Sequence, residues 1–138
     1  MKKLISTAFA YMIVGLALGL FYREYTKIAS FTGQTNLSLL HTHTLMLGMF
    51  FFLVAALFEG QLKITEHKSF NKFFNFYNIG LILSIILMGA RGFLDMNSGT
   101  ISKGLNASVS GMAGIGHIIL TVGLFYFFKM LRDKAQNK

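Results

Sequence analysis

Long, uninterrupted apolar stretches dominate the pattern of the 138-residue chain. Four of them approach the roughly 20 residues that an α-helix needs to cross the hydrocarbon core of a bilayer. Their residues do not alternate between apolar and polar with the period of two that marks a membrane strand. We therefore predict an all-α integral membrane four-helix bundle in a single domain, with spans at residues 4–22, 39–58, 73–90 and 107–128.

The three predicted connections, residues 23–38, 59–72 and 91–106, are too short to fold as domains. Any chemistry is therefore expected inside the bundle. At the end of the second span, Glu59 stands four residues before Lys63, and this spacing predicts an ion pair on the helix surface.

Composition supports the membrane prediction and limits the chemistry. Apolar residues make up 54% of the chain and charged residues only 13%, about half the charged fraction of a typical soluble domain. The chain has no cysteine, which excludes disulfides, thiolate metal sites and covalently attached c-type haem. It also has no proline, so we expect uninterrupted helices.

The net charge of +8 comes from basic residues at the ends of the apolar stretches. In these positions they contact lipid headgroups and set orientation, so we expect no nucleic-acid partner. With both termini in the cytoplasm, nine lysine and arginine residues lie on that side and four on the other, namely Arg23, Lys27, Arg91 and Lys103. The positive-inside rule thus predicts a multi-pass protein of the cell membrane with both termini in the cytoplasm.

Three of the four histidines, His41, His43 and His117, fall inside predicted spans, and His67 falls in a connection where it is expected to be ordinary surface. Ionisable side chains within membrane helices are costly and mark functional sites by default. A histidine can also be satisfied by a single hydrogen bond between helices. Because three occur together without a charged residue deep in the same spans, we predict metal or cofactor ligands.

Helix geometry favours haem over a compact site for one ion. Residues two apart lie about 200° apart around a helix, so His41 and His43 face nearly opposite sides of the second span. Each could then serve a separate haem iron, which accepts axial histidines. All three histidines lie in the outer half of the bundle, where Arg91 could bind the haem propionates. We predict haem b at His41, His43 and His117, with copper as a second candidate metal.

Small residues predict close helix contacts. Gly15 and Gly19 form a GxxxG motif, for which helix packing is the expected role. The cluster of Gly111, Gly114 and Gly116 before His117 instead favours space for a ligand. Methionines such as Met46 and Met112 are alternative axial ligands, although core filling is the expected role for any one methionine.

The run His41-Thr-His43-Thr-Leu-Met-Leu-Gly48 resembles the H-x-H helix of haem–copper oxidase catalytic subunits, and a similar stretch of the NnrS family of membrane haem and copper proteins. The oxidase subunit contains three pseudo-symmetric sets of four spans. The resemblance implies that this chain corresponds to one such set, as in a small four-span bacterial family of that superfamily, and that a homotrimer would rebuild the ring. It carries over only to His41 and His43, and motifs for the oxidase copper site have no match here.

Together these features predict a membrane b-type haem protein for electron transfer, or for sensing or detoxifying a diatomic gas such as nitric oxide or oxygen, with a respiratory redox partner. Two alternatives stay open at the level of sequence. One is an accessory subunit of a respiratory complex, in which the histidines only form hydrogen bonds. The other is a metal or haem transporter, in which they are transient sites.

Overall fold

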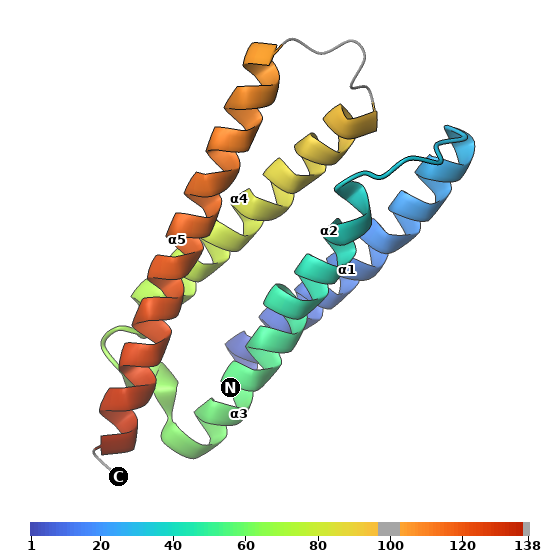
Figure 1. Ribbon diagram of the computed structural model, residues 1–138. Coiled ribbons are helices and arrows are strands. Elements are labelled where there is room, and N and C mark those ends of the chain that lie inside the picture. The colour runs from blue at the N-terminus through green and yellow to red at the C-terminus, as the bar shows by residue number, and fades with distance from the viewer. Residues whose placement is uncertain (97–102, 137–138) are drawn as a thin grey trace.

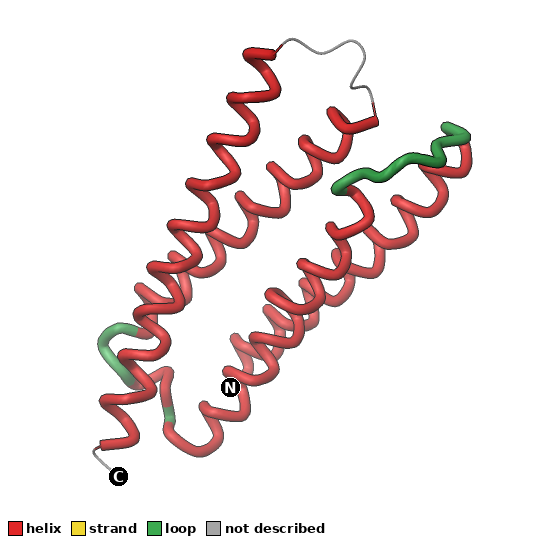
Figure 2. Tube along the Cα trace, viewed as in Figure 1, coloured by secondary structure: helices red, strands yellow, loops and turns green. Residues whose placement is uncertain are grey.

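The computed structural model describes residues 1–96 and 103–136, and the regular elements in those ranges are all helices (Figure 2). Within these residues, four candidate membrane spans, each 26–30 residues long, are apolar enough to cross a bilayer, which confirms the predicted number. In chain order the elements are α1 (Lys2–Ile28), α2 (Leu37–His43), the π-helix η1 (Thr44–Phe50), α3 (Phe51–Leu62), the 3₁₀-helix η2 (Ile64–Glu66), α4 (Phe70–Met96) and α5 (Lys103–Gln136).

The helices extend well beyond the predicted spans. Helix α1 continues through Arg23 and Lys27, so the first connection is only residues 29–36 rather than 23–38. The apolar pattern locates the part of a helix that lies in hydrocarbon, whereas the helix itself ends only where its backbone leaves helical geometry. At the third connection α4 runs to Met96 and α5 begins at Lys103, while residues 97–102 lie outside the described residues.

The bundle consists of two helical hairpins (Figure 1). Helix α1 packs along the continuous rod of α2, η1 and α3, and α4 packs along α5. The rod joins the hairpins through α2 and η1, which both contact α4. Both chain ends lie beside the connection between α3 and α4, because the Met1 amino group is 3.5 Å from Glu59 and Lys134 is 3.7 Å from Glu66.

Aromatic side chains fill the core where the hairpins meet. Phe52, Phe73 and Tyr77 are fully buried, and the Phe51 ring stacks on the Tyr77 ring with centroids 4.1 Å apart. Phe127 brings α5 into the same cluster, 5.0 Å from Phe51. Aromatic contacts of this kind stabilise by about 0.5–1.5 kcal/mol each beyond the area they bury.

The second span is not the uninterrupted α-helix that we expected. Immediately after the histidine pair, Thr44–Phe50 form a π-helix, whose wider turns shift the backbone hydrogen bonds to i→i+5. The buried Tyr77 hydroxyl donates to the Leu47 carbonyl at 2.8 Å and so supports this segment from α4. Hydropathy cannot distinguish α from π geometry, because both keep an apolar segment helical.

The connection between α3 and α4 corrects the expected pairing of Glu59 with Lys63. Lys63 ends α3 in a left-handed conformation with φ 49°, while the Glu59 carboxylate accepts hydrogen bonds from the Thr65 amide at 2.8 Å and the Thr65 hydroxyl at 2.5 Å. The turn thus replaces the surface pair that the spacing predicted. His67, expected to be ordinary surface, accepts a bond from the Ser69 amide and lies 3.5 Å from Asp133.

Candidate functional site

At the end of the bundle remote from the termini, Asp95 holds the start of α2 against the end of α4. One carboxylate oxygen accepts hydrogen bonds from the Asn36 amide at 3.0 Å and the Asn36 side chain at 2.6 Å. The other lies 3.1 Å from the Arg91 guanidinium. Beside them the Thr35 hydroxyl donates to the Gly92 carbonyl at 2.7 Å. The carboxylate therefore ties Asn36, the residue before the helix that carries His41 and His43, to the end of α4.

Replacing Asp95 with alanine is expected to lower the free energy of unfolding by about 2 kcal/mol, because hydrogen bonds to charged groups contribute about 1.5–3 kcal/mol and the ion pair with Arg91 would be lost as well. Unfolding in mixed detergent and dodecyl sulfate micelles measures the change. The control is Glu24→Ala, which removes an exposed pair with Arg23 and should change stability by less than about 0.5 kcal/mol. Equal effects of the two substitutions would show that the link from Asp95 to Asn36 and Arg91 does not stabilise the bundle.

His41 is turned towards α1. A β-carbon built on Gly19 would lie 3.5 Å from the His41 Cβ, so the GxxxG motif brings α1 close to this histidine. The Nδ1 atom of His41 is buried without a hydrogen-bond partner, and its Nε2 atom is 3.3 Å from the Thr42 hydroxyl. The packing role expected for Gly15 and Gly19 is borne out, since Gly15 likewise meets Leu45.

His43 has a different environment. Its Nδ1 atom is 3.0 Å from the Leu39 carbonyl one turn earlier. A carbonyl can only accept, so Nδ1 carries the proton and Nε2 keeps its lone pair. Histidines that bind metals usually hold their second nitrogen in this way, which fixes the tautomer and the ring orientation. Of the two histidines in the motif, His43 is the one whose Nδ1 atom is held in this way.

His117 lies on α5 in a cleft of about 390 Å³ that also contains Arg91, as the sequence suggested. Asn36 from the start of α2 and Ser84 from α4 complete its polar lining. The Ser84 hydroxyl is buried without a hydrogen-bond partner. The volume is within the range of about 300–1,000 Å³ for small-molecule sites. The cleft therefore combines an imidazole and a guanidinium, while the Ser84 hydroxyl is buried in its wall beside Gly116.

The structure brings only some of the predicted residues together. His117 and Arg91 share the cleft, whereas His41 and His43 do not line it. Across residues 1–96 and 103–136, no three His, Asp or Glu side chains cluster as a site for one ion. Met46 and Met112 are about half exposed.

Sequence reasoning missed Asp95 as the partner of Arg91. The spacing of four residues on one helix was a usable signal for this pair. It also missed the buried hydroxyl of Ser84, for which the sequence offers no signal, because a serine in an apolar span is usually satisfied by its own helix.

Comparison with protein families places the whole bundle in one group. Neither the curated proteins nor the solved structures contain a match to the chain. A family model described as a protein of unknown function, DUF2871, matches residues 1–134, which include the first three candidate spans and all but the last two residues of the fourth. The chain belongs to this DUF2871 family.

Proposed function

We propose that the protein binds haem b in the membrane through its intramembrane histidines, and that it transfers electrons or binds a diatomic gas such as nitric oxide or oxygen. The observation that carries this proposal is the contact between His43 Nδ1 and the Leu39 carbonyl at 3.0 Å. It leaves Nε2 as the nitrogen available to iron.

His117 is the second proposed ligand, and Arg91 is the proposed partner of a haem propionate in the same cleft. Arg91 already pairs with Asp95, so its charge is partly compensated, and any propionate contact would share it. His41 fits the role less well, because its Nδ1 atom is buried and its Nε2 atom lies 3.3 Å from the Thr42 hydroxyl. We assign no residues to copper.

The separation of His43 from the cleft of His117 supports a site completed by a second copy of the chain. Large apolar side chains are exposed on every candidate span, including Leu16, Leu57, Ile86 and Phe125. In a membrane these faces meet lipid or other helices. A homotrimer of four-span units, resembling the twelve-span oxidase subunit, would bring histidines of neighbouring chains towards one haem. This part of the proposal is fold-level analogy.

The proposed orientation places both termini in the cytoplasm of a bacterium, at its inner membrane. Its support is the count of nine lysine and arginine residues at one end and four at the other. The outer half of the membrane would then contain the three intramembrane histidines, close to a periplasmic redox partner or gas.

A visible spectrum of the detergent-purified protein, reduced minus oxidised, tests the proposal. We expect a sharp α-band and a Soret band at a stoichiometric ratio to protein. A shift with carbon monoxide would assign an open axial position and gas binding, and no shift would assign electron transfer. Absence of a Soret band after expression with added haem precursor would contradict haem binding and favour the accessory-subunit or transporter alternatives.

A further inference from the structure

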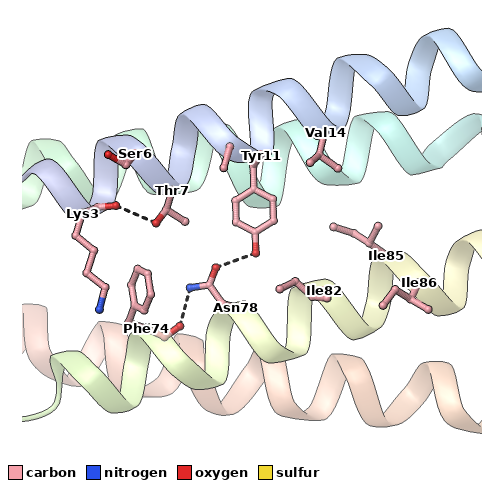
Figure 3. A pocket seen from close by; sticks show the side chains of 11 residues that line it. Lys3, Ser6, Thr7, Tyr11, Val14, Phe74, Asn78, Ile82, Ile85 and Ile86 are labelled. Atoms are coloured by element: carbon pink, nitrogen blue, oxygen red, sulfur yellow. Dashed lines mark hydrogen bonds between the residues drawn. The ribbon is translucent and has the colours of Figure 1, made fainter.

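A groove of about 670 Å³ lies between α1 and α4, and Figure 3 shows the side chains that line it. It is separate from the histidines, none of which lines it. Its wall along α1 runs from Lys3 to Val14, a distance of about 16 Å at 1.5 Å per helical residue. This is about half the 30 Å thickness of the hydrocarbon core, that is, the depth of one leaflet.

The two ends of the groove differ in chemistry. Lys3, Ser6 and Thr7 lie at the end that begins the span, where the headgroups of a bilayer would be. Further in, the walls are hydrocarbon from Val14 on α1 and from the isoleucines of α4, namely Ile82, Ile85 and Ile86. A ligand that matches this arrangement has a polar head and a long hydrocarbon chain.

The charge at the mouth selects an anionic head. The Lys3 ammonium lies 3.9 Å from the centre of the Phe74 ring, which holds it over the groove. Lys3 forms no ion pair with a carboxylate in the described part of the chain, and the residues that line the groove include no acid. A lipid phosphate would supply the missing counter-charge.

The polar groups deeper in the groove do not require a second polar group on the ligand. The Tyr11 hydroxyl donates to the Asn78 side-chain oxygen at 2.8 Å, and the Asn78 amide donates to the Phe74 carbonyl at 2.7 Å. Figure 3 shows both bonds, which satisfy these groups within the protein. This part of the groove thus suits an acyl chain better than the ring of a quinone.

We propose that the groove between α1 and α4 binds one anionic phospholipid, with its phosphate at Lys3 and an acyl chain along Val14 and the α4 isoleucines. The lipid would lie in the leaflet on the side of the chain termini. Since it contacts one helix from each hairpin, it would also stabilise their association.

Native mass spectrometry of the full-length protein, with phosphatidylglycerol or phosphatidylcholine of identical acyl chains, tests this site. We expect phosphatidylglycerol to bind about fivefold more tightly, and Lys3→Gln to remove that preference, as for the loss of one basic residue near a membrane surface. Lys2→Gln removes the same charge one residue away, outside the groove lining, and should keep the preference. Equal losses in the two variants would overturn the site in favour of diffuse attraction.

A second pair of variants tests the hydrocarbon part. Ala10 lines the groove, so Ala10→Phe should displace the acyl chain and reduce binding of both lipids at least fivefold. Ala17→Phe, on an exposed position of the same helix, should not. If a long-chain menaquinone instead displaces phosphatidylglycerol, and its binding depends on Asn78 but not on Lys3, the groove is a quinone site and the lipid proposal is wrong. Native mass spectrometry detects the bound lipid by its own mass, so this test does not depend on whether haem is bound.

Discussion

Replacing Gly80 with valine is expected to force α4 away from α5 and to lower the free energy of unfolding by about 3 kcal/mol or more. A β-carbon at this position would lie 2.7 Å from the Leu120 Cα and would also meet the Leu120 amide nitrogen. These are backbone atoms, which cannot move aside as the end of a flexible side chain can. Overpacking typically costs about 1–3 kcal/mol, and a clash that separates two backbones exceeds that range.

The matched control for Gly80 is Gly114→Val on α5. Gly114 is exposed and has no atom within 4 Å of an added β-carbon, so the change should alter stability by less than about 1 kcal/mol. Thermal unfolding in detergent, followed by near-ultraviolet circular dichroism of the aromatic core, compares the two variants. Similar melting temperatures would show that α4 and α5 do not depend on close contact at Gly80.

The helix contacts explain which glycine predictions succeeded. The GxxxG spacing of Gly15 and Gly19 correctly indicated packing, because residues four apart share one helix face. On α5, Gly116 packs against Ser84, whereas Gly111 and Gly114 meet nothing within 4 Å. A run of glycines does not show which member faces a neighbour, and this depends on how α4 and α5 cross.

The number of spans could be predicted because a helix that crosses the hydrocarbon core must be long and apolar, and both properties can be read from the sequence. The π-helix at Thr44–Phe50 could not, since it depends on support from Tyr77 on another span. For the same reason the sequence identified the three intramembrane histidines but could not show how the surroundings of each ring differ. The Leu39 carbonyl that orients His43 is local, while the enclosure of His41 depends on α1.

Replacing His43 with alanine is expected to abolish haem binding. Removing only the group that hydrogen-bonds to a metal ligand lowers metal affinity about 10–100-fold. Removing the ligand itself should therefore lower haem affinity by more than about a hundredfold. The haem-to-protein ratio, read from the Soret band against total protein, measures this. Added imidazole should restore part of the absorption, because it replaces the missing nitrogen without restoring the side chain.

The other histidines make this test specific. His67→Ala removes a histidine that bonds Ser69 and faces Asp133 in the connection, and it should leave the haem-to-protein ratio unchanged. His117→Ala should lower the ratio or open an axial position to carbon monoxide, whereas His41→Ala should have the smallest effect of the three intramembrane variants, because its ring is turned towards α1. Full haem content in His43→Ala, together with its loss in His41→Ala, would move the ligand to the other face of α2. The contact with Leu39 would then be only a structural hydrogen bond.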